Sequence, residues 1–165
     1  MRRKDRQVLD SEKIDNIIFS CHCCRLGFID DNNVYIVPLN FGYENIDKKR
    51  VFYFHSSAEG KKIRLIKNQK SVGFELDTNY QLNEAKTACE YSAKFQSVIG
   101  IGNIFLIESF EEKIYALKQI MFHNTGKHQW DFPAEVIKKM AIFKLEVVSL
   151  SCKEHKENYK ISLAV

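Results

Sequence analysis

Short runs of β-branched and aromatic residues, separated by turn signals, constrain the fold of this chain more than any other feature. Such residues favour strands because their side chains fit a pleated, half-buried surface. Polar segments at 30–33 and 45–49 join consecutive runs too closely for a crossover helix, which predicts antiparallel hairpins. The expected strands cover residues 25–29, 34–41, 51–55, 71–76, 95–107 and 141–150. The sequence therefore predicts a mainly β fold, an antiparallel barrel with helical covers.

The sequence predicts four helices. Asp10 or Ser11 can cap a short helix, and helical spacing of apolar residues recurs at 61–68 and 111–123. Pro133 suits the first turn of another short helix. The buried face of the first helix is expected to consist of Ile14, Ile17 and Ile18.

Three interruptions of the strand pattern carry structural expectations. Pro38 cannot donate a ladder hydrogen bond, so it marks an edge strand, a bulge or a strand end. Gly100 and Gly102 predict a bulge or a close backbone approach within a long strand. Residues 77–90 are polar and show no clear period, so we expect a long loop there.

Length and charge exclude several classes of protein. A chain of 165 residues favours one domain, and 45% hydrophobic with 28% charged residues is typical of a globular protein. The net charge of +4 is small and its lysines and arginines are scattered, which argues against nucleic-acid binding. There is no apolar run of about 18 residues and no signal-peptide pattern, so we expect no membrane span and a cytoplasmic location. The five cysteines are a poor disulfide framework.

The loop before the helix at 61–68 has the composition of an anion site. A helix start offers unpaired N–H groups, to which Ser56 and Ser57 would add hydroxyls and Lys61 and Lys62 ammonium groups. Together these groups would cradle a phosphate. The alternative is an ordinary serine-capped helix with exposed lysines.

Two further segments suit a ring-shaped ligand. Residues 37–43, Val-Pro-Leu-Asn-Phe-Gly-Tyr, could supply an apolar wall and a few backbone donors to a flavin ring, or could simply end an interior strand. Residues 96–102 contain Gly-x-Gly but lack the third glycine and the strand–turn–helix setting of a dinucleotide fingerprint, so a bulged strand is the alternative.

The cysteine and histidine clusters give weaker signals. Residues 21–24, Cys-His-Cys-Cys, cannot readily converge on one tetrahedral ion, so no metal is predicted. Cys24 and Cys89 are expected to be small buried hydrophobes. His123, His128 and Trp130 surround the glycine at 126 and would form a surface turn, or a lid or partner contact near a ligand.

Taken together, these motifs resemble the flavin-binding split barrels related to pyridoxamine-phosphate oxidase, and among them most of all the 5-nitroimidazole-resistance (Nim-type) proteins. The similarity covers roughly residues 1–150. It rests on the order and spacing of Met-Arg-Arg-Lys-Asp-Arg at 1–6, Cys24-Arg25-Leu26, residues 37–43, Phe54-His55-Ser56, Glu59-Gly60-Lys61-Lys62, Cys89, Ser97-Val98-Ile99-Gly100, and His123-x-Thr125-Gly126 with Trp130.

This resemblance implies a six-stranded antiparallel split β-barrel that forms a homodimer and binds flavin in clefts shared by both subunits. The flavin-binding domain would comprise residues 1–152, and 153–165 would be a loosely ordered tail. By position, the ring would be lined by Val37, Pro38, Leu39 and Asn40. His55 and Ser56 would sit beside ring and phosphate, and Lys61, with Lys62, would hold the phosphate. Ser97 and Val98 would contact flavin too, either from the same chain or from the partner chain.

The implied cofactor is FMN, with FAD as an alternative, and the implied activity is reduction of small acceptors such as nitroimidazoles and other nitroaromatics. In the oxidase branch of this family, arginines near the C-terminus bind the substrate. No such pair follows Arg64 here, which argues against oxidation of pyridoxamine phosphate itself. His55 is the candidate catalytic residue, as a hydrogen-bond or proton donor near working pH, unless it only caps its strand. The alternative function is a non-catalytic flavin or haem carrier, with His22, His55, His123 and His128 as available haem ligands.

Overall fold

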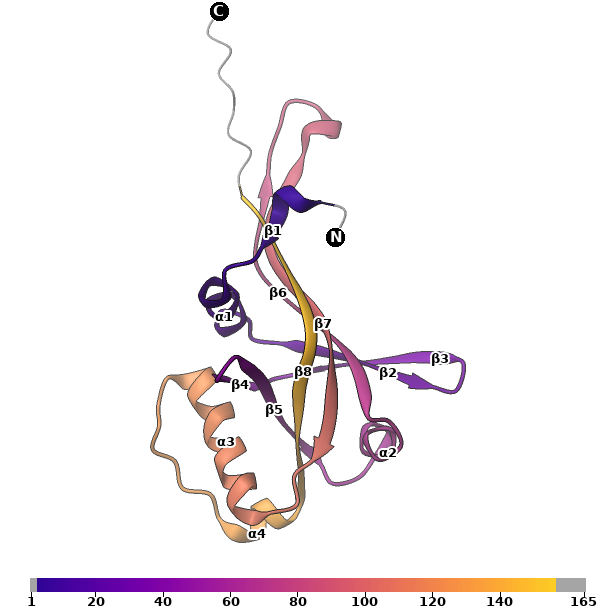
Figure 1. Cartoon of the computed structure of the whole chain (residues 1–165), viewed down its shortest axis with the longest axis vertical. Helices are drawn as coiled ribbons and strands as arrows, with labels where there is room; N and C mark the ends of the chain where they lie inside the picture. The colour runs from indigo at the N-terminus through magenta and orange to yellow at the C-terminus, as the bar shows by residue number, and fades with distance from the viewer. Residues whose placement is uncertain (1–2, 157–165) are drawn as a thin grey trace, which may run out of the picture.

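The computed structural model describes residues 3–156 and shows one antiparallel, strongly twisted sheet (Figure 1). The strand order is β3-β2-β6-β7-β8-β5-β4, and β1 pairs with β8. The sheet has eight strands where six were expected, and β3 and β4 remain as its two edges, so the barrel does not close. The strands are β1 (Gln7–Val8), β2 (Cys24–Asp30), β3 (Asn33–Leu39), β4 (Gly42–Ile46), β5 (Lys49–Ser57), β6 (Ser71–Asn83), β7 (Ser92–Leu106) and β8 (Met140–His155).

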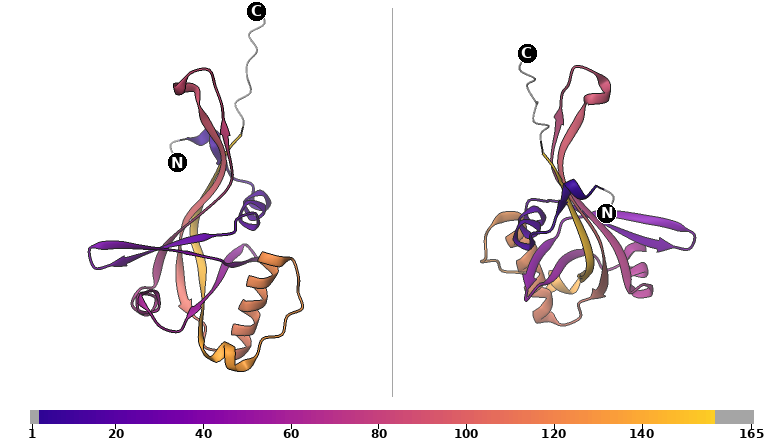
Figure 2. Two further views of the ribbon diagram at one scale, coloured as in Figure 1. Left: turned by 180° about the vertical axis from the view of Figure 1, so that it is seen from behind. Right: turned by 45° about the horizontal axis from the view of Figure 1, so that its top comes forward.

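The helices cover the sheet at separate places (Figures 1 and 2). They are α1 (Ser11–Phe19), α2 (Lys61–Asn68), α3 (Phe110–Thr125) and α4 (Ala134–Lys138), with short 3₁₀ turns at Lys4–Arg6 and Ala88–Glu90. The side chain of Asp10 caps α1 by accepting from the backbone N–H of Lys13, as the sequence indicated. Ser109 caps α3, which ends at Gly126 in the left-handed conformation (φ 69°).

The main core lies inside the curved sheet. Alternate residues of β2 point inward, and Leu26 and Phe28 are fully buried there. Phe52 on β5 contacts Phe74 on β6 with ring centroids 5.3 Å apart. The buried face of α1 completes this core with Ile14, Ile17 and Ile18, the three residues expected.

A second, smaller core forms where α3 and α4 pack on the opposite face of β5 and β8. Tyr53 and Ile142 from the sheet meet Leu117 and Ile120 from α3. At Gly42 on β4, a Cβ atom would lie 2.4 Å from the backbone nitrogen of Ile120. The absence of a side chain at this position lets α3 approach β4 directly.

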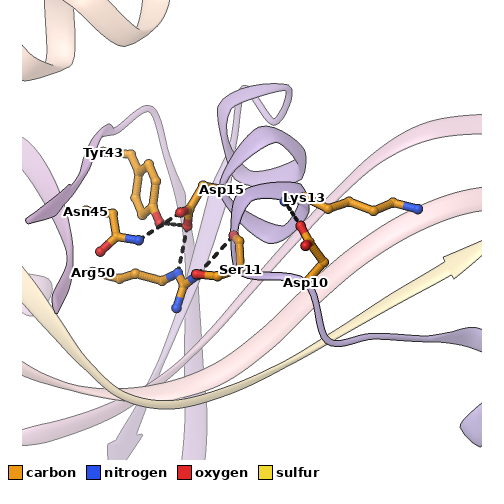
Figure 3. Close-up of polar contacts among 7 residues, drawn as sticks. All are labelled: Asp10, Ser11, Lys13, Asp15, Tyr43, Asn45 and Arg50. Carbon is orange, nitrogen blue, oxygen red and sulfur yellow. Dashed lines mark hydrogen bonds and ion pairs between the residues drawn. The ribbon is translucent and has the colours of Figure 1, made fainter. Parts of the chain in front are cut away.

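A polar cluster anchors α1 to the β4–β5 hairpin (Figure 3). Asp15 Oδ1 accepts hydrogen bonds from the Tyr43 hydroxyl (2.5 Å) and from Arg50 Nε (2.8 Å), and Oδ2 accepts from Asn45 Nδ2 (2.7 Å). Arg50 also donates to the Ser11 hydroxyl (2.8 Å). Burial and the hydrogen bond to Asp15 raise the pKa of Tyr43, so its hydroxyl stays protonated and donates.

The structure confirms the expected roles of proline and glycine in the strands. Pro38 lies in edge strand β3. The β7–β8 register shifts between Ile101 and Gly102, and a Cβ atom at Gly100 would lie 2.4 Å from the carbonyl oxygen of Ser149. Close strand packing therefore requires glycine at Gly100.

Several expected boundaries differ from the structure. The segment 34–41 was expected to be one strand, but β3 ends at Leu39 and a separate strand, β4, begins at Gly42. The prediction of a loop at 77–90 is wrong, because β6 continues to Asn83. Residues 77–83 are mostly polar, and only Tyr80 and Leu82 show the period-two spacing by which a strand is recognised in a sequence. Strand β8 continues to His155, three residues past the expected domain end, and the tail residues 157–165 lie outside the described residues.

Cysteines and helices add three observations on residues 3–156. No helix there is both long and apolar enough to span a bilayer. Cys24 is buried as expected, whereas Cys89 is exposed at the tip of the β6–β7 hairpin, contrary to expectation. Among these residues no group of three or more side chains is arranged to hold a metal ion.

Candidate functional site

Strand β5 delivers the loop that opens α2, and the helix start lacks a side-chain cap. Gly60 is the N-cap residue with φ 116°, a conformation that favours glycine, and within the described residues no side chain caps the first turn. Ser56 Oγ donates to the Ser57 carbonyl (3.0 Å), and Ser57 Oγ accepts from the Glu59 N–H (3.5 Å). The first N–H groups of α2 thus remain available to an anion.

Lys61 points to the β2–β3 hairpin. Its ammonium lies 2.6 Å from Asp30 Oδ2 and 4.8 Å from the ring centroid of Tyr35. Arg64 binds the other oxygen of the same carboxylate at 2.9 Å. Hydrogen bonds from Lys61 and Arg64 lower the pKa of Asp30, so this carboxylate stays charged and neutralises much of the cationic face of α2.

Lys62 differs from Lys61 in its burial and in its polar contacts. Its side chain is half-buried, and it makes no ion pair or hydrogen bond with any residue in 3–156. Burial lowers its pKa, because the ammonium loses water without gaining a counter-ion. An anion at the start of α2 would satisfy Lys62 and the free amides together.

Of the four ring-lining candidates, Val37, Pro38 and Leu39 lie in β3 and Asn40 directly follows it. Val37 and Leu39 are partly buried and pack against the main core. Pro38 is exposed, and Asn40 is exposed while its Nδ2 donates to the His22 carbonyl (3.0 Å). The side chains of Val37 and Leu39 therefore belong to the core beneath the expected ring site, while Pro38 and Asn40 face outward.

His55 lies two residues before the end of β5, on the outer side of the sheet. It is exposed, pairs in register with Ile142, and has no hydrogen bond within residues 3–156. His22 is likewise exposed without such a bond. In contrast, His123 is hydrogen-bonded to the Cys21 carbonyl and His128 stacks on Phe122 at 4.2 Å.

Ser97 and Val98 lie far from the α2 loop within one chain. Ser56 pairs with Ala141 on β8, whereas Val98 pairs with Cys152, eleven residues further along that strand. At about 3.3 Å per residue the separation along β8 is roughly 35 Å. The Val98 side chain is fully buried, and Ser97 is half-buried on the outer face. One chain therefore assembles His55, Ser56, Lys61 and Lys62 but not Ser97 or Val98.

Sequence reasoning missed Asp30, Tyr35 and Arg64, which surround Lys61. No motif joins these residues, and Asp30 was read only as part of a turn. The available signal was an acidic residue at the end of a strand in a chain whose next helix is rich in lysine and arginine. Beside them lies a groove of 330 Å³ lined in part by Ala58, Ile63 and Lys67.

Comparison with known proteins identifies the fold family. The sequence model of the pyridoxamine 5′-phosphate oxidase family matches residues 10–155. A candidate 5-nitroimidazole antibiotic resistance protein from Bacteroides thetaiotaomicron VPI-5482 is 31% identical, with a TM-score of 0.77 over 89% of this chain and 85% of that one. No match was found among curated proteins.

Two more distant structures share the fold. The flavocytochrome Anf3 from Azotobacter vinelandii is 19% identical, with a TM-score of 0.79 over 94% of this chain and 72% of that one. The FAD and heme binding protein from Mycobacterium smegmatis is 14% identical, with a TM-score of 0.76 over 92% and 74% of the two chains. The family match over most of the sequence and the 31% identical structure show that this chain belongs to the pyridoxamine 5′-phosphate oxidase family of split-barrel proteins.

Proposed function

We propose that two copies of this chain bind flavin in shared clefts, with the flavin phosphate at the start of α2. The observation that carries the proposal is Lys62, a half-buried cation without a counter-ion among residues 3–156, beside the uncapped α2 amides that follow Gly60. A phosphate is the dianion that this arrangement fits best. From the sequence we expected Lys61 to lead, but its ion pair with Asp30 favours Lys62 as the principal ligand.

The outer sheet face supports a homodimer. Ile36, Gly27, Gly73 and Ile101 follow one another in register across β3, β2, β6 and β7. Ile36 and Ile101 are 60% and 51% exposed. A Cβ atom at Gly27 or Gly73 would make only ordinary contacts, at 3.8 and 3.9 Å, so the fold does not require glycine there. The glycines leave a flat apolar face on which a second copy can lie closely.

A shared cleft also accounts for Ser97. It lies on the same outer face as Ile99 and Ile101, because alternate residues of β7 point to one side. In a dimer built on this face, Ser97 of one subunit can meet flavin held by Lys62 of the other, which one chain cannot achieve.

The activity that we propose is reduction of small acceptors, among them nitroaromatics such as nitroimidazoles. A bound flavin supplies the redox chemistry, and the chain binds and orients it. Val37 to Asn40 would flank the ring, and the exposed imidazole of His55, which has no hydrogen bond within residues 3–156, would hold or deliver a proton beside it. The 31% identical structure supports this acceptor class by its name. We expect FMN before FAD, a nicotinamide or another reductant as electron donor, and a cytoplasmic location.

The second candidate function is a flavin or haem carrier without turnover. His22 and His55 favour it, because each exposes an imidazole that makes no hydrogen bond within residues 3–156. Two structural neighbours bind haem according to their names. Titration with haemin separates the candidates, since a Soret band without flavin uptake would identify the carrier.

The deciding experiment is a titration of the purified protein with FMN and FAD. Fluorescence quenching measures flavin binding, and sedimentation velocity measures the oligomeric state. We expect saturable uptake of about one flavin per chain by a dimer. Gly73→Val should weaken the dimer and release flavin while leaving the fold intact, and Gly126→Asn, at a left-handed position away from that face, is the control. A protein that takes up neither FMN nor FAD contradicts the proposal.

A further inference from the structure

From Thr78 onward the β6–β7 hairpin projects from the rest of the molecule as an arm, here defined as residues 78–94 (Figures 1 and 2). The pairing of β7 with β8 begins at Phe95, opposite His155. Gln81–Asn83 and Ser92–Lys94 pair with each other, and His155 Nδ1 donates to the Ala93 carbonyl near the base of the arm (2.6 Å). A two-stranded hairpin without a packed face is at best marginally stable in water.

Large apolar side chains are exposed along this arm. Tyr80 is 71% exposed, Leu82 49% and Tyr91 46%. Leu82 pairs with Ala93, which points to the same side of β7 as Ser97, Ile99 and Ile101. The apolar surface of the arm therefore continues the outer face on which the second copy is proposed to lie.

The arm also has a defined direction and shape. Asn79 adopts φ 56°, and the β6–β7 register shifts between Thr78 and Gln81, so a bulge sets the angle at which the arm leaves the sheet. Asn79 Nδ2 donates to Gln96 Oε1 (2.6 Å) at its base, and Thr87 Oγ1 donates to Glu90 (3.0 Å) near its tip. An arm ordered in this way loses little further entropy on binding.

The geometry points to an intermolecular arm: residues 78–94 pack on a second copy of this chain, and Tyr80 and Leu82 close over the flavin held by that copy. The inference rests on the proposed function, because it uses the shared cleft. The arm begins at Thr78, the residue after Asp77, and Asp77 pairs with Ser97. If Ser97 reaches the flavin of the other subunit, then the arm lies immediately past it. Exposed aromatic side chains on a preorganised element are typical interface anchors.

The test separates action on the chain's own site from action on the partner's. One chain carries Tyr80→Ser with Leu82→Ser, and a second carries Lys62→Ala; each is purified as a homodimer. The heterodimer is isolated through two affinity tags, and flavin binding is measured for all three. The control for the arm substitutions is Ile46→Ser with Val136→Ser, two apolar residues of similar exposure (54% and 49%) on β4 and α4.

We expect the arm homodimer to bind flavin at least about tenfold more weakly than the parent, with unchanged circular dichroism, while the control binds normally. In the heterodimer, one site combines an intact Lys62 with an intact arm from the other chain. It should therefore bind about one flavin per dimer with parental affinity. A heterodimer without this tight site, or an arm homodimer that binds like the parent, overturns the inference. If the parent takes up no flavin, the proposed function fails, and an unchanged dimer dissociation constant of the arm variant then overturns the arm as well.

Discussion

The ammonium of Lys61 on α2 lies 2.6 Å from the carboxylate of Asp30 at the end of β2, whereas the next residue, Lys62, has no ion pair within residues 3–156. Two adjacent lysines of one motif thus have different surroundings. Lys61 joins the helix to the β2–β3 hairpin, and Lys62 stays free for a ligand. The difference gives the proposed phosphate site its sharpest test.

Lys62→Ala should weaken flavin binding at least about tenfold, because one charge-assisted hydrogen bond contributes about 1.5–3 kcal/mol. Lys61→Ala should change the dissociation constant by less than about threefold, because exposed ion pairs contribute little and its charge is already balanced by Asp30. Fluorescence titration with FMN measures both. Lys67→Ala, an exposed lysine of the same helix, is the control. A larger loss for Lys61→Ala than for Lys62→Ala would reverse the assignment.

His55→Ala should retain flavin but reduce acceptors more slowly, about tenfold or more, because a positioned proton donor accelerates turnover rather than cofactor binding. The measurement is steady-state reduction of a nitroimidazole alongside the flavin content of the same sample. His128→Ala, whose imidazole lies on the exposed turn after α3, is the matched control. Parental rates in His55→Ala with flavin content unchanged would show that the imidazole has no part in the chemistry.

Asp15→Ala should lower the free energy of unfolding by about 2–4 kcal/mol, because it leaves Arg50 and Tyr43 without their shared acceptor. Both carboxylate and guanidinium are largely buried, with 19% and 14% of the side chain exposed, so water cannot fully replace the contact. Urea unfolding monitored by circular dichroism gives the value. Glu84→Ala, at an exposed position on the arm, should change stability by less than about 0.5 kcal/mol. Equal stability of the two variants would contradict the anchoring of α1.

His123 should make stability fall as the pH falls below the ordinary histidine pKa of about 6.5. Its Nε2–H donates to the Cys21 carbonyl at 2.9 Å, and its buried Nδ1 has no partner within residues 3–156. Burial lowers its pKa, so below pH of about 6.5 the unfolded chain binds a proton that the folded chain does not. Above that pH both forms are neutral and the effect vanishes.

His123→Phe tests this origin, because phenylalanine retains the aromatic contact with Phe41 but cannot titrate. The variant should be less stable at about pH 8, by roughly 1 kcal/mol for the lost hydrogen bond, yet lose less stability between about pH 7 and pH 5. Urea unfolding across that range measures the slope. A slope in the variant as steep as in the parent would assign the pH dependence to other groups.

Gly100→Ala should destabilise the fold by about 1–3 kcal/mol, because its Cβ atom would meet the Ser149 carbonyl at 2.4 Å. Gly27→Ala, where the nearest atom lies at 3.8 Å, is the matched control on another strand and should leave the stability of the chain close to that of the parent. Thermal unfolding of the two variants side by side decides whether the close strand approach is required.

Features governed by neighbouring residues were predictable. The cap at Asp10, one of two candidates, and the inward face of α1 follow from local chemistry. For Pro38, and for Gly100 with Gly102, the sequence narrowed the choice to an edge, a bulge or strand end, and to a bulge or close approach, among which the sheet decided. The extension of β6 to Asn83 was missed, because residues 77–83 are mostly polar and only Tyr80 and Leu82 show the period-two spacing of a strand. An arm of this kind becomes visible only when its partner strand is in place.

The amino-acid sequence by itself determined that a strand, a glycine-ended loop and a lysine-rich helix succeed one another from His55 to Lys62, because hydrogen bonding and side-chain spacing along a short segment decide such elements. Only the tertiary structure decided that Asp30 neutralises Lys61 and that Ser97 lies far from the loop. Both depend on which distant strands pair and in which register. Strand pairing and register are decided by the burial of all the apolar side chains together, so no single motif can determine them.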